Sequence, residues 1–123
     1  MSRFSLSERL QSLGFAFQGL GFVLRTQHNA WIHLSASLAV VGAALFLGVS
    51  PMEWCWLVVA MGGVWCAEAF NTAIEELANA VDSEPNPMIG RAKDAAAGAV
   101  LIAALAAAII GVIILGPPLW SLL

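Results

Sequence analysis

Charged residues are scarce in this sequence. They make up 11% of the 123 residues, whereas about a quarter of the residues of an ordinary soluble domain are charged. No Asp, Glu, Lys or Arg occurs from Thr26 to Met52 or from Ala95 to Leu123. This shortage excludes an ordinary soluble globule and a disordered chain. Because about twenty apolar residues are enough to cross the hydrocarbon layer, both segments are predicted to contain membrane spans.

Cysteine and basic residues are also few. The chain has two cysteines, Cys55 and Cys66. They lie about 16 Å apart along one predicted helix, too far apart for a disulfide bond, so we expect them to be buried thiols. A disulfide-stapled secreted domain is excluded. The net charge of −3 gives no support to nucleic-acid binding, which depends on a basic face.

The apolar residues near the N-terminus repeat with helical spacing, which predicts an amphipathic surface helix over residues 5–25. Ser5 and Glu8 have the spacing of a capping box at its start. A helix packed on other protein is the alternative interpretation. The repeated residues are Leu6, Leu10, Leu13, Phe17, Leu20 and Leu24.

The remaining chain predicts three membrane-spanning helices, so we expect one all-α membrane domain over residues 1–123. Prolines and glycines mark the breaks between the spans, because proline cannot continue a helix without losing a hydrogen bond. The third span is expected to stop at Gly116-Pro117-Pro118. The predicted spans cover about 29–47, 52–81 and 90–115.

All five basic residues fall on one side of this predicted pattern. Three precede the first span, and two stand at the start of the third. Since Lys and Arg concentrate in cytoplasmic segments, we expect a cytoplasmic N-terminus and an outside C-terminus. The basic residues are Arg3, Arg9, Arg25, Arg91 and Lys93.

A stripe of polar residues follows one side of the second span, at spacings of three and four. Its first member, Glu68, lies about 25 Å of helix beyond Pro51, near the inner edge of the hydrocarbon. A carboxylate at that depth is costly unless it is paired or hydrated, so this side is expected to line a polar cavity or a subunit interface. The alternative is a solvated helix face emerging from the membrane. The stripe is Glu68, Asn71, Glu75, Asn79 and Asp82.

Basic residues at the start of the third span complement this stripe. Arg91, Lys93 and Asp94 precede a run of small residues that would allow close helix packing. Carboxylates beside cations suit a Mg²⁺-bound polyphosphate, because carboxylates hold the metal and cations hold phosphate oxygens. Alternatively, the cations are membrane anchors that pair with Asp82 and Glu84. No common phosphate-binding loop or protein-kinase motif occurs.

Two segments carry a family resemblance. Glu68-Ala-Phe-Asn71-Thr-Ala-Ile-Glu75 and Lys93-Asp94-Ala-Ala-Ala-Gly-Ala-Val100 resemble the signature of the small prokaryotic diacylglycerol kinase and undecaprenol kinase family. Upstream, Phe15–Leu20 and Arg25–Leu34 are also similar. The resemblance covers about residues 13–115. It implies an ATP-dependent lipid kinase of a bacterial cytoplasmic membrane, assembled as a homotrimer with active sites shared between subunits.

The resemblance also implies roles for individual residues. Glu68 matches the catalytic base, with Asn71 beside it, and Glu75 matches a carboxylate that binds the metal of Mg-ATP. Residues that match or lie near nucleotide contacts are Lys93, Asp94, Glu84 and Asn86.

The chain departs from the family pattern at several positions. Gln27 stands where the family commonly has a second metal-binding Glu, and Asn79 replaces an Asp. Gln27 is kept as a candidate metal ligand through its carbonyl oxygen. Pro85-Asn86 also differs from the residues often found in that loop. His28 and His33 are interpreted as interfacial anchors.

Two other functions compete with the kinase. One is a small transporter that uses Glu68 as a carboxylate switch, although the stripe continues toward the cytoplasm and Lys93, which a midplane site does not need. The other is an inactive membrane subunit, because of Gln27. The sequence does not decide between undecaprenol and diacylglycerol as the acceptor lipid. The segment Asn71–Glu75 is slightly more similar to the undecaprenol kinase branch.

Overall fold

The computed structural model describes residues 4–81 and 84–123. It contains four helices, in the order α1 (Leu6–Thr26), α2 (His28–Leu47), α3 (Pro51–Val81) and α4 (Pro87–Trp120). The last three are long and apolar enough to cross a membrane. The all-α architecture with three candidate spans is therefore confirmed. Arg3 and the stripe residue Asp82 lie outside the described residues.

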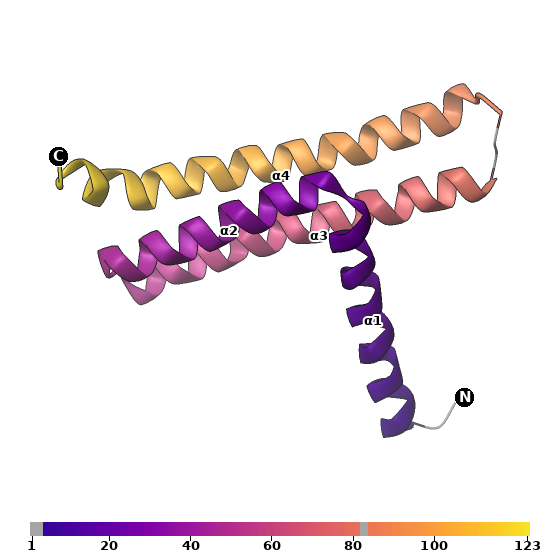
Figure 1. The fold of residues 1–123 in the computed structure, drawn as a ribbon, viewed down its shortest axis with the longest axis horizontal. Coiled ribbons are helices and arrows are strands. Elements are labelled where there is room, and N and C mark those ends of the chain that lie inside the picture. The colour runs from indigo at the N-terminus through magenta and orange to yellow at the C-terminus, as the bar shows by residue number, and fades with distance from the viewer. Residues whose placement is uncertain (1–3, 82–83) are drawn as a thin grey trace.

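Helices α2, α3 and α4 run alongside one another, while α1 projects across their direction (Figure 1). The closest packing is between α3 and α4. Most of α1 is exposed, including Leu6, Leu10 and Leu13, and its one buried residue is Val23 near the junction with α2. An apolar side left uncovered on a helix that crosses the spans is the arrangement expected for a helix lying in the membrane surface.

The three long helices differ in length, so the longer ones extend beyond one end of the shortest. Helix α2 has 20 residues, which is about 30 Å and matches the hydrocarbon thickness. Helices α3 and α4 have 31 and 34 residues. Since a short turn joins the C-terminal end of α2 to the start of α3, α3 extends about 15 Å beyond the N-terminal end of α2.

The turn between α2 and α3 depends on a left-handed glycine. Gly48 has φ 65° and ψ 47°, a conformation that costs residues with a Cβ about 1–2 kcal/mol. The backbone N–H groups of Gly48 and Val49 both donate to the carbonyl oxygen of Ala44, at 3.1 and 3.3 Å. Ser50 and Glu53 then start α3 with a reciprocal capping box: each backbone N–H donates to the other side chain, at 3.0 and 3.2 Å.

Helix α4 is longer than the sequence predicts at both ends. Pro87 occupies the first turn, where its missing N–H has no intrahelical partner to lose, and the Asn86 side chain accepts from the Met88 N–H at 2.9 Å. The expectation that the helix stops at Gly116-Pro117-Pro118 was wrong. Both prolines lie inside the helix, because a fixed φ near −65° suits a helix and the carbonyl groups left without donors lie in its last turns.

The expectation of buried thiols was also wrong for this chain. Cys55 and Cys66 are both free and exposed, on the side of α3 opposite its buried residues. The apolar core is small and lies near the turn between α2 and α3 and the C-terminal part of α4. It is formed by Ala44, Leu57, Ile114 and Leu115.

The Gly48 turn generates a stability prediction. Gly48→Val should lower the unfolding temperature of the detergent-solubilised protein, because a β-branched side chain is strained at positive φ. Gly48→Asn should retain most of the stability, since Asn tolerates this conformation. Thermal unfolding followed by circular dichroism measures both. Equal stabilities for the Val and Asn variants would contradict a left-handed turn.

Candidate active site

The polar stripe of α3 lies on the side that faces the other spans. Glu68 and Asn71 are buried, Glu75 is half-buried, and Asn79 is exposed. Burial therefore decreases along the stripe toward the C-terminal end of α3. This gradient excludes a uniformly solvated helix face for its first half.

Glu68 is the most deeply placed charged residue of the stripe. It is 0% exposed, and neither carboxylate oxygen has a hydrogen-bond partner among the described residues. The Thr72 hydroxyl donates to the backbone carbonyl of Glu68 at 2.9 Å, not to its carboxylate. Because burying a charge without partners is costly, Glu68 must gain its compensation from a nearby group or from a ligand.

His33 of α2 is the group nearest to this carboxylate. Its Nε2 atom lies 3.3 Å from Oε2 of Glu68, and the His33 side chain is 17% exposed. The interpretation of His33 as an interfacial anchor is therefore replaced by a contact with the buried carboxylate. The signal that finds this contact is hairpin geometry: His33 lies about 21 Å before the C-terminal end of α2, and Glu68 lies about 25 Å after the start of α3.

Two further side chains hold His33 in place. The rings of His33 and Trp65 meet edge to face, with centroids 6.4 Å apart. The Trp65 indole N–H donates to Oγ of Ser37 at 3.2 Å. His33 and Ser37 are four residues apart on α2, and Trp65 and Glu68 are three apart on α3, so each pair lies on one side of its helix.

The part of the candidate site beyond the N-terminal end of α2 lies between α3 and α4. Lys93 is half-buried and lies one turn before the buried Ala96, which places it on the side of α4 that packs against α3. Asp94 is exposed, because adjacent residues of a helix point about 100° apart. Within residues 4–81 and 84–123, neither Glu75 nor Lys93 forms a salt bridge.

The other candidate ligands occupy helix junctions. Gln27 joins α1 to α2, with its backbone N–H donating to the Val23 carbonyl at 3.0 Å, and is half-buried. Its side chain makes no capping hydrogen bond and so retains its carbonyl oxygen for a ligand. The side-chain oxygen of Asn86 accepts the hydrogen bond that caps α4. Only the amide N–H groups of this side chain therefore stay available to a ligand. Glu84 is exposed between α3 and α4.

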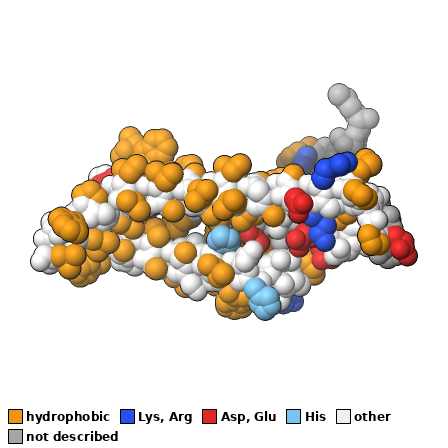
Figure 2. Space-filling model, turned by 90° about the horizontal axis from the view of Figure 1, so that it is seen from above, with side chains coloured by type: hydrophobic (Ala, Val, Ile, Leu, Met, Phe, Trp, Pro, Cys, Tyr) orange, Lys and Arg blue, Asp and Glu red, His pale blue; other side chains and the backbone are white. Residues whose placement is uncertain are grey.

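The charged side chains gather at one end of the molecule. Figure 2 shows Asp, Glu, Lys and Arg over the half that contains the extended parts of α3 and α4, while the half toward the C-terminus is mainly hydrophobic. The division matches the two depths set by the helix lengths.

An apolar groove of about 630 Å³ lies between α2, α3 and α4. His33 and Ser37 are its polar lining residues, and the rest is aliphatic or small, including Ala104 and Gly111. The groove extends from the depth of His33 to Leu119 near the end of α4. It therefore leads from the apolar interior of the membrane region to the side chain that touches Glu68.

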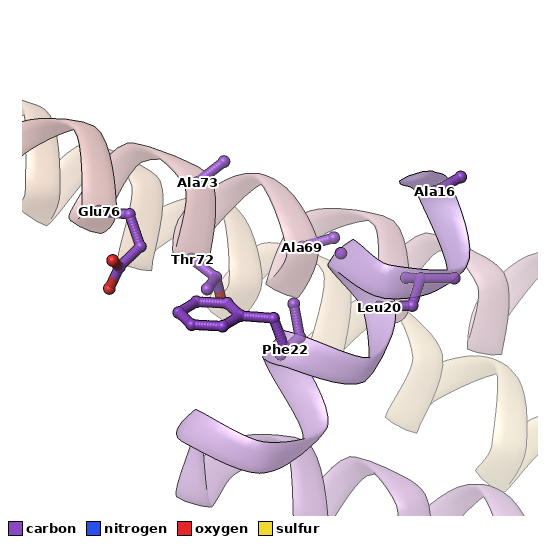
Figure 3. A pocket seen from close by; sticks show the side chains of 9 residues that line it. Ala16, Leu20, Phe22, Ala69, Thr72, Ala73 and Glu76 are labelled. Carbon is purple, nitrogen blue, oxygen red and sulfur yellow. The ribbon is translucent and has the colours of Figure 1, made fainter. Parts of the chain in front are cut away.

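A second cavity, of about 390 Å³, lies between α1 and α3. Figure 3 shows Phe22 and Leu20 of α1 facing Ala69 and Thr72 of α3, with the Glu76 carboxylate at the edge. Glu76 is exposed and lies off the stripe of Glu68, as the sequence indicates. This cavity is thus separate from the Glu68–His33 contact.

The arrangement suits a base and an anion site at different depths. A carboxylate buried against apolar surface can remove a proton from a hydroxyl group that arrives through the membrane. Among the described residues, no three His, Cys, Asp or Glu side chains cluster as a closed metal site. Mg²⁺ is commonly bound by only one or two carboxylates together with substrate phosphates, so Glu75 and the Gln27 oxygen fit a metal that arrives with a nucleotide.

Comparison with known proteins identifies a family for the chain. A model of the family described as prokaryotic diacylglycerol kinase matches residues 14–115. The undecaprenol kinase of Bacillus subtilis (strain 168) is 34% identical over 117 residues, which cover 95% of both chains. The diacylglycerol kinase of Synechocystis is 37% identical over 93% of this chain and 66% of its own length. That of Escherichia coli (strain K12) is 31% identical over 91% of this chain and 88% of its own.

Proposed function

The chain belongs to the prokaryotic diacylglycerol kinase family, whose members are lipid kinases, and from this premise we propose that it transfers the γ-phosphoryl group of ATP to the hydroxyl of a membrane lipid alcohol. The acceptor is undecaprenol or diacylglycerol. The observation that carries the proposal is Glu68: a fully buried carboxylate near the inner edge of the hydrocarbon, on the same stripe as Glu75. A soluble acceptor would not require a base at that depth.

Glu68 acts as the general base. It takes the proton of the lipid hydroxyl while the oxygen forms a bond to the γ-phosphorus, and the bond from that phosphorus to the β–γ bridging oxygen breaks. The products are the lipid phosphate and ADP. Asn71, buried one turn further along α3, places its amide beside the reacting groups.

The nucleotide lies toward the cytoplasm, along the extended parts of α3 and α4. Glu75 is seven residues beyond Glu68, about 10 Å along the helix. Glu75 and Gln27 would hold Mg²⁺, which neutralises phosphate charge when bound. Lys93 binds phosphate oxygens, and further nucleotide contacts come from Asp94, Glu84 and Asn86.

The groove between α2, α3 and α4 supports a lipid acceptor. Its lining is apolar except for His33 and Ser37, so an acyl or prenyl chain lying in it would bring the hydroxyl to the depth of Glu68. A groove of small and aliphatic side chains does not distinguish the two chain types. Relatives named for each lipid match the chain, and slight motif similarity favours undecaprenol.

The protein is placed in the bacterial cytoplasmic membrane with its N-terminus and the loop before α4 in the cytoplasm. The support is the distribution of Arg9, Arg25, Arg91 and Lys93, which all precede α2 or lie at the start of α4. In this orientation the charged end of Figure 2 meets cytosolic ATP.

The active form is a homotrimer in which neighbouring subunits share sites. Lys93 is half-buried against α3, whereas Asp94 is exposed on another side of α4. In a single chain the two residues therefore point in different directions. A neighbouring subunit would give Asp94 a role at a second site.

We first predict that Glu68→Gln abolishes phosphorylation. Gln is nearly isosteric but cannot accept the hydroxyl proton, and a general base contributes about 10²–10⁴ in rate. Purified protein in mixed micelles with labelled ATP is assayed with undecaprenol and with diacylglycerol. Glu76→Gln is the matched control, because Glu76 is an exposed carboxylate off the stripe, and it should keep normal activity.

The same assay separates the competing functions. A wild-type protein that phosphorylates neither lipid would contradict the kinase and leave the transporter or the inactive subunit. A Glu68→Gln variant with more than about a tenth of the wild-type rate would show that Glu68 is not the base.

Glu75→Ala and Lys93→Ala should weaken the binding of Mg-ATP. Glu75 acts through the metal and Lys93 through phosphate charge, so both variants should raise the KM for Mg-ATP by about tenfold or more. Direct binding of a non-hydrolysable nucleotide analogue checks this independently of turnover. Normal analogue binding by both variants would mean that the nucleotide lies elsewhere.

Gln27→Glu should lower the Mg²⁺ concentration needed for half-maximal activity. The substitution restores a negative charge at a proposed metal ligand, and Mg²⁺ prefers carboxylate oxygens. The maximal rate should not fall. The measurement is a Mg²⁺ titration of activity at saturating ATP and lipid. An unchanged Mg²⁺ dependence, with the oligomer intact, would show that Gln27 does not reach the metal.

A further inference from the structure

The ionised form of Glu68 needs a partner within the membrane. Both of its carboxylate oxygens are buried and lack hydrogen bonds from the described residues. An unpartnered carboxylate in apolar surroundings is costly, and the neutral acid cannot accept a proton from a hydroxyl. A group that stabilises and orients the ionised carboxylate of Glu68 therefore contributes to catalysis, even if that group does not contact the phosphate.

His33 is the polar group placed to meet this need. Within the described chain, the salt-bridge contact of Glu68 is the one with His33, 3.3 Å between Nε2 and Oε2. The other described side chains that the neighbouring helices place around His33 are uncharged. They are Trp65 from α3 and small residues such as Ala104 and Ala107 from α4, across the groove. Lys93 lies eleven residues before Ala104, about 16 Å nearer the cytoplasm.

The surroundings of His33 also fix the direction of its ring. Trp65 packs against the imidazole edge to face, and Trp65 is itself anchored by its hydrogen bond to Ser37. Both contacts are made by Trp65, and they join α2 to α3 beside the imidazole. The ring is therefore held with Nε2 near Glu68. The distance of 3.3 Å is already short enough for a hydrogen bond, and a rotation of the imidazole that aligns its N–H with Oε2 would make the contact a charge-assisted hydrogen bond.

We propose that His33 is the positioning residue for Glu68: its Nε2–H donates to Oε2 and leaves Oε1 to receive the proton of the lipid hydroxyl. This inference rests on the proposed kinase function. His33 lines the groove as well, so it stands where an acceptor arriving through the groove meets the carboxylate. One oxygen of Glu68 is thus occupied by the protein, and the other is aimed at the substrate.

The test compares three substitutions in the same lipid kinase assay. His33→Gln keeps an N–H donor of similar reach, whereas His33→Leu removes the donor at similar volume. His33→Leu should lower kcat by about 10- to 100-fold, the value of a hydrogen bond to a charged group, and leave the KM for Mg-ATP within about twofold. His33→Gln should keep kcat within about fivefold of wild type. His28→Leu is the control, since His28 is exposed at the start of α2, and it should leave activity unchanged.

A double-mutant cycle shows whether His33 acts through Glu68. In the Glu68→Gln background, His33→Leu should change the residual rate by less than about twofold, because the carboxylate that it positions is already gone. A general loss of packing would instead lower the rate in both backgrounds. If His33→Leu fails to assemble, His33→Asn replaces it, because its amide is too short to reach Oε2 and should lower kcat in the same way.

Several results would overturn the inference. They are a His33→Leu kcat within about twofold of wild type, a His33→Gln kcat as low as that of His33→Leu, or equal losses in the wild-type and Glu68→Gln backgrounds. These outcomes are distinct from failure of the proposed function. That failure would appear in the wild-type protein itself, as the absence of lipid phosphorylation with either acceptor.

Discussion

The burial of one carboxylate in the membrane is the constraint on which the rest of the site depends. Glu68 is fully buried at a depth where an unpaired charge is costly. The hairpin of α2 and α3 places Nε2 of His33 at 3.3 Å from this carboxylate, where it can offset part of that cost. The left-handed turn at Gly48 sets the register of that hairpin. A local backbone feature at one end of the spans thus decides which side chain meets Glu68 near the other end.

The different lengths of α2 and α3 place Glu68 and Glu75 in different surroundings. Because α2 has 20 residues and α3 has 31, Glu75 lies beyond the inner end of α2 while Glu68 does not. The deeper carboxylate is surrounded by protein and apolar surface, and the shallower one is half-buried. The proposed sites for a lipid hydroxyl and for a charged nucleotide need these different environments. One continuous helix can present residues to both because it is longer than the membrane is thick.

Much of this could be predicted from periodicity and composition alone. The bounds of α1, α2 and α3 agree with the expected helices within one residue, since apolar spacing, Gly and Pro are strong local signals. The third predicted span, which is α4, was predicted too short at its C-terminal end, because the Pro117-Pro118 pair was interpreted as a stop. Whether proline ends a helix depends on whether the freed carbonyl groups are near its end, which is a property of the whole element. Local rules do not contain that information.

The contact of His33 with Glu68 was missed for a different physical reason. It joins residues 35 positions apart, and a lone histidine near a helix end is more often an interfacial anchor than a partner of a buried acid. Only the register of the hairpin distinguishes the two, and register follows from the turn and the two helix lengths. The exposed Cys55 and Cys66 show a related limit. Composition indicates that such residues belong to a membrane segment, but which side of a helix is covered by its neighbours is decided by packing between elements and between subunits.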